Sequence, residues 1–141
     1  MVAALGISQL TKFEKLIKLR RNNAAYLSAR LSKYAIQVPR EPLGYKHAYQ
    51  LYSIRLPNSK IRNQLMKFLT KKGIMSKIFF EPVHMTHFYK KLGYGTTKLP
   101  ITEKIYDQIL TLPMYPGLTK DEMNFICDSV AEFMEKTKFL S

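Results

Sequence analysis

The sequence has little of what secreted and membrane proteins need. Cys127 is its only cysteine, which excludes an intramolecular disulfide. No apolar run approaches the roughly 20 residues of a membrane-spanning helix, and the start does not resemble a signal peptide. We therefore expect a cytoplasmic protein with no membrane partner.

Common phosphate and metal motifs are also missing. The sequence contains no glycine-rich phosphate loop, no HExxH motif, no internal repeat and no low-complexity tract. With 141 residues the chain is long enough to bury one core without disulfides, so we expect a single domain over residues 1–141 and no metal site.

Acidic residues are scarce as well. Ten Asp and Glu stand against 23 Lys and Arg, which gives a formal charge of +13. Such an excess is common in nucleic-acid-binding proteins. Here the basic residues are dispersed over 12–21, 67–77, 90–98 and the C-terminus, and no helix-turn-helix, zinc-finger or RNP signature accompanies them. We expect a solvated basic surface and do not expect nucleic acid as a partner. The alternative function is a standalone basic anion- or nucleic-acid-binding regulatory module.

Apolar periodicity predicts three main helices. The first covers about 2–32 and the last about 119–138, where Thr119 and Glu122 form a capping box. Ser59 and Gly73 bound the second, over 60–72. Cys127 belongs to the core stripe of the last helix, which favours a buried apolar role over a nucleophilic one.

The first helix has two different halves. A stripe of apolar and long side chains runs along it at steps of three and four residues: Leu5, Gln9, Leu10, Phe13, Leu16, Ile17, Arg20, Ala24, Leu27 and Leu31. The first two turns, Val2 to Ile7, are apolar or small on all sides, as in a helix that is enclosed. We expect this end to be exposed or to need a partner.

Three shorter stretches favour strands and form, with the helices between them, an α/β core over about 45–116. They are 45–56, 74–80 and 110–115, and they are rich in aromatic and branched residues. Thr102 is expected to cap a further helix between the last two. The strand–helix–strand order over 45–80 fits a crossover unit, but it fits an antiparallel arrangement equally well.

The stretch GIMSKIFFEPVHMTHFY, residues 73–89, combines strand residues with closely spaced polar groups. Pro82 ends the strand and leaves Glu81, His84 and His87 on a loop. Their three-residue spacing could hold zinc, but Pro82 disrupts the common helix that such a site requires. The other interpretation is a short helix opened by His87, with Phe88 and Leu92 buried.

This stretch and the segment LPITEKIYDQILTLPMYPGLTKDEM resemble the C-terminal part of the DegT/StrS family of pyridoxal-phosphate (PLP) dependent nucleotide-sugar aminotransferases, and in particular its perosamine-synthase-like members. The matching residues are Ala3, Ala4, Gly6, Gln9, Leu10, Gly73, Ile74, Phe79, Phe80, Pro82, His84, Leu112, Pro113, Tyr115, Pro116, Leu118, Thr119 and Glu122. The resemblance therefore extends over nearly the whole chain.

The resemblance implies an α+β fold, the small domain of a fold-type I aminotransferase, with a small, mainly antiparallel three-stranded sheet packed against helices. It also implies a keto sugar nucleotide as substrate, in amino-sugar and surface polysaccharide biosynthesis. In the family, the PLP-bearing lysine and the aspartate that pairs with the pyridine nitrogen precede the helix matched here by 2–32. We therefore expect PLP in the complete enzyme only, and no transamination by this chain alone.

The same resemblance implies partners. Because Met1 begins directly inside a helical pattern, we expect this chain to be truncated or to work with a separately encoded large PLP domain. The apolar start of the first helix also favours a homodimer.

Four residues are the candidate substrate contacts: Lys77, Phe79, Glu81 and His84. Side chains alternate along a strand, so Lys77, Phe79 and Glu81 share the face opposite Ile78 and Phe80, which we expect in the core. The resemblance places this strand end beside the PLP and sugar site. It implies Lys77 at an anionic group, Phe79 as an apolar wall and His84 at a sugar or diphosphate oxygen.

Two of these residues depart from the family pattern, and one has a second interpretation. Many relatives have arginine where Lys77 stands, and lysine lacks the planar two-pronged donor of arginine. Tyrosine or another residue is common in place of Glu81. The alternative for His84 is a hydrogen bond to the loop backbone after Pro82.

Overall fold

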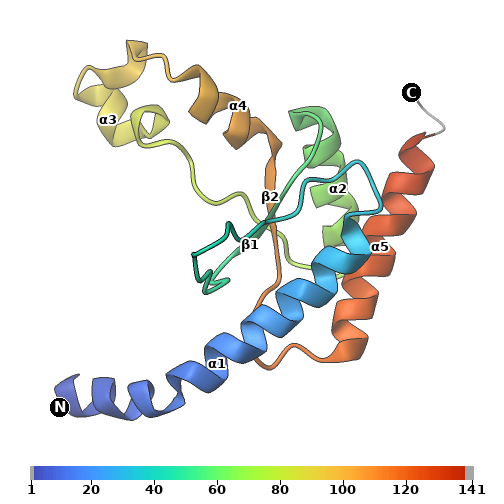
Figure 1. Ribbon diagram of the computed structural model, residues 1–141. Coiled ribbons are helices and arrows are strands. Elements are labelled where there is room, and N and C mark those ends of the chain that lie inside the picture. The colour runs from blue at the N-terminus through green and yellow to red at the C-terminus, as the bar shows by residue number, and fades with distance from the viewer. Residues whose placement is uncertain (1, 139–141) are drawn as a thin grey trace.

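A computed structural model describes residues 2–138 of the chain. In chain order the elements are α1 (Val2–Leu31), β1 (Tyr52–Arg55), α2 (Ser59–Lys71), the 3-10 turn η1 (Val83–Met85), α3 (His87–Lys91), the 3-10 turn η2 (Tyr94–Thr96), α4 (Pro100–Gln108), β2 (Ile109–Leu112) and α5 (Lys120–Lys138). Figure 1 shows long α1 and α5 beside a small central sheet. The predicted α+β class with a small antiparallel sheet is confirmed.

The sheet has two full strands. β1 and β2 run antiparallel, with Tyr52 opposite Leu112 at one end and Arg55 opposite Ile109 at the other. A single bridge extends each edge: Gln37 pairs with Arg55, and Lys77 pairs with Thr111. The predicted full strand over 74–80 is therefore reduced to the one pair at Lys77.

Local geometry explains why two strands are shorter than predicted. Tyr49 has φ +47°, a left-handed conformation that interrupts extended structure, so β1 begins only at Tyr52. Ile78 and Phe80 were both expected in the core. Ile78 packs against it, but Phe80 is 72% exposed. Alternation therefore fails after Phe79, ahead of Pro82.

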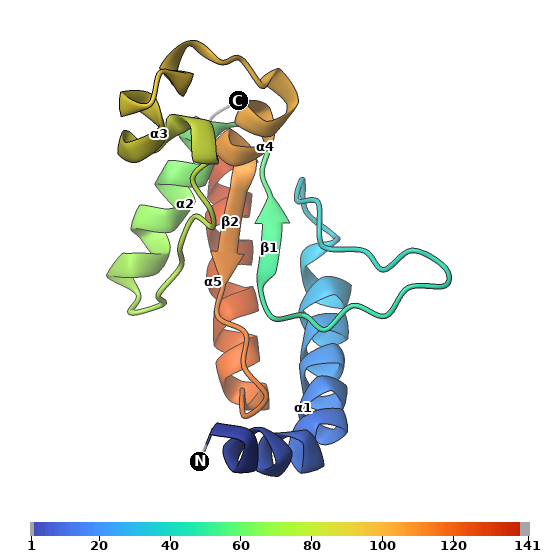
Figure 2. The same cartoon turned by 90° about the vertical axis from the view of Figure 1, so that its left-hand side faces the viewer.

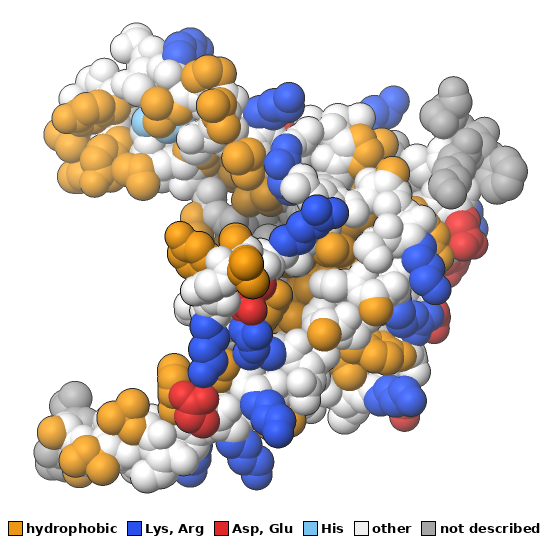
Figure 3. All heavy atoms as spheres, in the orientation of Figure 1, with side chains coloured by type: hydrophobic (Ala, Val, Ile, Leu, Met, Phe, Trp, Pro, Cys, Tyr) orange, Lys and Arg blue, Asp and Glu red, His pale blue; other side chains and the backbone are white. Residues whose placement is uncertain are grey.

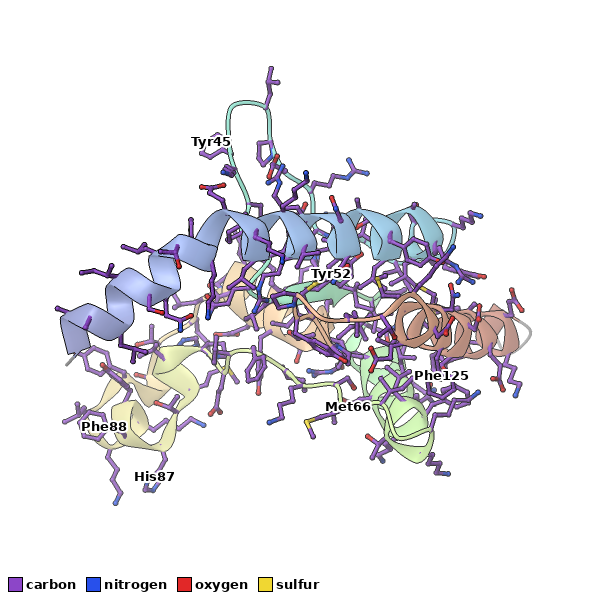
Figure 4. All side chains as sticks on the ribbon, turned by 90° about the horizontal axis from the view of Figure 1, so that it is seen from below. Tyr45, Tyr52, Met66, His87, Phe88 and Phe125 are labelled. Atoms are coloured by element: carbon purple, nitrogen blue, oxygen red, sulfur yellow. The ribbon has the colours of Figure 1, made fainter. Side chains whose placement is uncertain are left out.

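Three helices enclose the core with the sheet. α5 contacts both α1 and α2, and α2 also contacts β2 (Figure 2). Tyr52 is fully buried beneath α1 (Figure 4), and its hydroxyl lies 2.8 Å from Ser28 Oγ. The largest fully buried side chains among the described residues are Leu27, Leu31, Tyr52, Ile54, Leu65, Leu69, Leu110, Leu112, Cys127, Ser129 and Val130. Both the capped last helix and the burial of Cys127 agree with the prediction.

The N-terminal half of α1 lies outside this core. Its apolar stripe becomes buried only from Ile17 onward, whereas Leu5, Leu10 and Phe13 are 63%, 69% and 49% exposed. In Figure 1 this half projects away from the rest of the chain. These apolar side chains have no cover from the described residues of this chain, so the expectation of a partner at this end stays a prediction.

Helix ends follow local capping chemistry, with two corrections. Asn58, not Ser59, caps α2, because its Oδ1 accepts the Ile61 N–H at 3.0 Å. At the other end the N–H of Ile74 donates to Leu69 O at 2.9 Å, and that of Gly73 to Thr70 O at 3.0 Å. These two bonds form a Schellman motif, which requires the φ of +77° that Gly73 adopts.

The second correction concerns α4, which begins at Pro100 with Leu99 as its N-cap, not at Thr102. Proline is favoured in the first turn because the backbone N–H it lacks would have no helical partner there. The predicted capping box of α5 is present: Thr119 N donates to Glu122 Oε2 at 2.8 Å, and Glu122 N to Thr119 Oγ1 at 3.2 Å.

Residues 81–99 form a lobe that projects from the core (Figure 1). His87 begins α3, as predicted, but Phe88 and Leu92 are 65% and 58% exposed rather than buried. Figure 4 shows Phe88 and His87 at the outer end of this lobe. Among residues 2–138 no helix has the length and apolarity needed to cross a membrane.

Candidate functional site

A pocket of about 320 Å³ lies beside the sheet at the Lys77 bridge. Three separate segments line it: Gln50 and Leu51 before β1; Met75, Lys77 and Phe79 after α2; and Thr111, Leu112, Pro113 and Met114 at the end of β2. We call it the Lys77 pocket. Lys77 is the one charged residue in its lining, and most of the other lining residues are apolar.

The backbone fixes the place of Lys77. Its N–H donates to Thr111 O at 3.0 Å, and its carbonyl accepts the Thr111 N–H at 2.7 Å. This two-bond pair sets the register of the 74–80 segment on β2, so the side chain of residue 77 emerges at the pocket. The ammonium stays solvated, because Lys77 is exposed.

Phe79 lines the same pocket two residues further on. The Lys77 Nζ lies 6.0 Å from the centre of the Phe79 ring, at the limit of a cation–π contact. The structure thus brings together Lys77 and Phe79, as strand alternation predicts. A pocket with one cation and an apolar ring beside it suits a ligand that carries both an anionic and an apolar part.

Glu81 and His84 do not line this pocket. Glu81 is exposed on the lobe. His84 is buried, and its Nε2 lies 3.2 Å from Glu103 Oε1. Glu103 also accepts the Leu99 N–H at 2.9 Å, and this backbone bond, followed by the bond to His84, lowers the pKa of the Glu103 carboxyl. His84 has a carboxylate partner here and not the loop-backbone partner of the alternative interpretation.

The metal interpretation of Glu81, His84 and His87 finds no geometric support in the described residues. No group of three His, Cys, Asp or Glu side chains within them is arranged to hold a metal ion. His47, another histidine of the chain, accepts the Tyr49 N–H on Nδ1 at 2.8 Å.

Helix α1 holds two walls of the Lys77 pocket. Arg20 Nη1 donates to Tyr49 O at 3.1 Å, to Gln50 O at 3.2 Å and to Met114 O at 3.3 Å. Nearby, the buried Asn23 donates to Tyr115 O at 3.0 Å. These contacts join segments that are far apart in the sequence.

Sequence reasoning missed several residues of the site. Gln50, Leu51, Met75 and Met114 are ordinary polar or apolar residues, and their positions depend on how three segments converge. Sequence periodicity places Arg20 on the core-facing stripe of α1, which is the correct face, but it predicts none of the three carbonyl acceptors of Arg20. No sequence signal marks Glu103 as the partner of His84.

Figure 3 shows the wider surroundings. Hydrophobic side chains gather on the 81–99 lobe and on the N-terminal end of α1, and the surface is hollowed between them. The large apolar side chains exposed in these two regions include Leu5, Ile7, Leu10 and Phe13 on α1, and Val83, Phe88, Leu92, Tyr94 and Leu99 on the lobe. Monomeric surfaces rarely show so many large apolar side chains on one side, so this face is suited to a protein partner.

Comparison with known proteins now gives the family. The DegT/DnrJ/EryC1/StrS aminotransferase family model matches residues 1–131. The chain belongs to this family.

Individual relatives agree. GDP-perosamine synthase of Vibrio cholerae is 33% identical over 135 residues, which cover 94% of this chain and 36% of that protein. A DegT DnrJ EryC1 StrS aminotransferase from Brucella abortus has a similar structure, with 29% identity, a TM-score of 0.79, and coverage of 91% of this chain and 34% of that one. The Helicobacter pylori aminotransferase PseC, involved in pseudoaminic acid biosynthesis, also has a similar structure. Its sequence identity is 25% and the TM-score is 0.84, with coverage of 94% of this chain and 36% of that one. The chain thus spans about a third of the length of the relatives it matches.

Members of the family are PLP-dependent, and Spr1654 of Streptococcus pneumoniae has been solved in PLP and PMP forms. The Lys77 pocket does not fit this cofactor. PLP needs a Schiff-base lysine, an acidic partner for the pyridine nitrogen and a cradle of donors for its phosphate. Lys77 is the only charged group in the lining, so the pocket contains no carboxylate for the ring nitrogen.

Proposed function

We propose that this chain is the C-terminal part of a PLP-dependent aminotransferase that acts on a keto sugar nucleotide, and that it supplies substrate contacts but not the cofactor site. Family membership over residues 1–131 supports the reaction class. The observation that carries the division of labour is the Lys77 pocket, which offers a cation and an apolar wall without an acidic group.

Lys77 is assigned to an anionic group of the substrate. Its ammonium is exposed, and the backbone pair with Thr111 fixes its Cα, so a phosphate oxygen can reach the charge with little reordering of the backbone. Phe79 provides an apolar surface beside that charge. Glu81 and His84 stay proposed contacts on the adjoining lobe, where His84 would have to exchange Glu103 for a sugar or diphosphate oxygen.

The rest of the enzyme is proposed to cover the exposed apolar face. The N-terminal half of α1 has four large apolar side chains exposed, Leu5, Ile7, Leu10 and Phe13. Burying them would contribute favourable hydrophobic free energy to association. A PLP-binding portion of the enzyme, together with a second copy in a homodimer, is the partner we assign to this surface.

Binding of a nucleotide sugar to this chain tests the assignment of Lys77. UDP-glucose and GDP-mannose are titrated into the chain, and amide signals of Met75, Lys77 and Leu112 are followed by NMR. We expect Lys77→Met to weaken binding roughly threefold to tenfold, since it removes one charged contact. The control is Lys90→Met, which also removes one positive charge but lies on the lobe, away from the pocket lining. Equal affinity of native chain and K77M would reject the assignment.

A further inference from the structure

We propose that Arg20 is a positioning residue of the Lys77 pocket, because its guanidinium joins the two walls that Gln50 and Met114 form. The inference rests on the proposed function in one respect: it takes the pocket to be a substrate surface.

The β1–β2 ladder stops where this pocket begins. Tyr52 and Leu112 are its last pair, so Gln50 and Leu51 on one side and Pro113 and Met114 on the other lie beyond the paired strands. Pro113 has no N–H and cannot extend the ladder. The two segments therefore need another connection if the pocket is to keep its width.

Arg20 supplies that connection from α1. Its Nη1 is 3.2 Å from Gln50 O and 3.3 Å from Met114 O, one acceptor on each wall, and 3.1 Å from Tyr49 O. An arginine is suited to this role because it is always charged and has only donors, so three carbonyl oxygens can surround it without competition from an acceptor. Hydrogen bonds from a charged donor are also stronger than those between neutral groups.

The wall before β1 also has a strained residue that these contacts hold in place. Tyr49 has φ +47°, a conformation that non-glycine residues rarely adopt. Its N–H donates to His47 Nδ1 at 2.8 Å, and its carbonyl accepts from Arg20 at 3.1 Å. Such strain persists where surrounding contacts determine the backbone, and here both sides of the residue are held.

The pocket side of the wall follows from this arrangement. Tyr49 and Gln50 present their carbonyls to Arg20, while Gln50 and Leu51 line the pocket. Movement of the Arg20 guanidinium would therefore be transmitted to both walls together. Lys77 and Phe79, held by the bridge to Thr111, would keep their places.

The experiment compares four forms of the chain: native, Arg20→Met, Arg20→Lys and Arg40→Met. Arg40 is exposed and does not line the pocket, so R40M controls for the loss of one positive charge. Backbone amide signals of Leu51 and Met114 report on the two walls, and inorganic pyrophosphate is the binding probe. Titrations are done in about 0.15 M salt, where the screening length is near 8 Å, so distant charges contribute little.

We expect R20M to shift the Leu51 and Met114 signals together, to leave those of Ile54 and Leu110 in place, and to weaken pyrophosphate binding at least threefold more than R40M does. R20K, which keeps a charged donor, should show smaller shifts of the same signals. If R20M does not fold, R20K is compared with R40M in its place. Shifts and affinity in R20M that match R40M would overturn the inference. If the native chain binds no pyrophosphate, the anion role of Lys77 fails, and the amide signals alone decide the role of Arg20.

Discussion

His84 and Glu103 form a side-chain pair that connects the 81–99 lobe to α4. The buried Nε2 of His84 lies 3.2 Å from Oε1 of Glu103, and the same oxygen accepts the Leu99 N–H. Pro82 is also buried in this part of the lobe, whose outer helix α3 contains no buried residue. The pair therefore ties the buried part of the lobe to α4.

Replacement of His84 tests whether this contact stabilises the fold. We expect His84→Ala to lower the free energy of unfolding by about 1–3 kcal/mol, because it removes a buried side chain together with its hydrogen bond. Urea denaturation followed by circular dichroism measures this change, with the exposed His87→Ala as the matched control. Unchanged stability in H84A would contradict this prediction and would leave the proposed sugar contact as the only role of His84.

Acid should destabilise the chain through two carboxylates. Hydrogen bonding to Arg21, and then to the His47 N–H, lowers the pKa of Glu41 to about 2, and bonding to Lys136 and Lys72 lowers that of Glu132 to about 2. A depressed folded-state pKa contributes stability that is fully present above the ordinary value of 4.5 and is lost as pH falls toward 2. The double variant Glu41→Gln/Glu132→Gln should show a shallower loss of stability over that range. A slope equal to that of the native chain would contradict the prediction.

Cys127 should be unreactive in the folded chain. Burial raises the pKa of its thiol to about 11, so almost none is thiolate at pH 8. We expect slow labelling by 5,5′-dithiobis(2-nitrobenzoic acid) at pH 8 and rapid labelling after addition of 6 M guanidinium chloride, since the reaction needs an accessible thiolate. Rapid stoichiometric labelling without denaturant would show that the helix packing around Cys127 is wrong.

Nucleic-acid binding tests the alternative function directly. Positive charge at +13 will attract DNA, but Figure 3 shows Lys and Arg side chains dispersed among polar and apolar groups on that face. We expect weak, sequence-independent mobility shifts that vanish near physiological salt. Tight binding to duplex or single-stranded oligonucleotides in about 0.2 M salt, with a steep salt dependence, would support the regulatory module instead.

The sequence predicted the helices best because their signals are local. Periodicity located α1 and α5, the Thr119–Glu122 box gave the start of α5, and Gly73 marked the end of α2 through a left-handed turn that disfavours other residues. Where two adjacent residues compete for one cap, as Asn58 and Ser59 do, composition does not decide between them. The prediction of a strand over 74–80 was wrong for a different reason. A strand needs a neighbouring strand to pair with, and within 74–80 only Lys77 pairs with one, at Thr111 of β2.

The candidate site was predictable in part. Alternation placed Lys77 and Phe79 on one face, and the structure shows both in one pocket. The opposite walls come from residues near 50 and 113, and their proximity follows from the β1–β2 pairing and from Arg20, neither of which leaves a sequence pattern. His84 and Glu103 meet for the same reason, because the lobe folds back onto α4.

Our central proposal is that this chain supplies substrate contacts, and not the cofactor site, of a PLP-dependent aminotransferase. The most direct test is incubation with PLP, reduction with borohydride, gel filtration and mass mapping of every lysine. We predict that no absorbance band of an internal aldimine survives gel filtration and that any PLP adducts are substoichiometric and scattered over exposed lysines. Stoichiometric labelling of one lysine, Lys77 above all, with a band that survives gel filtration, would contradict the account.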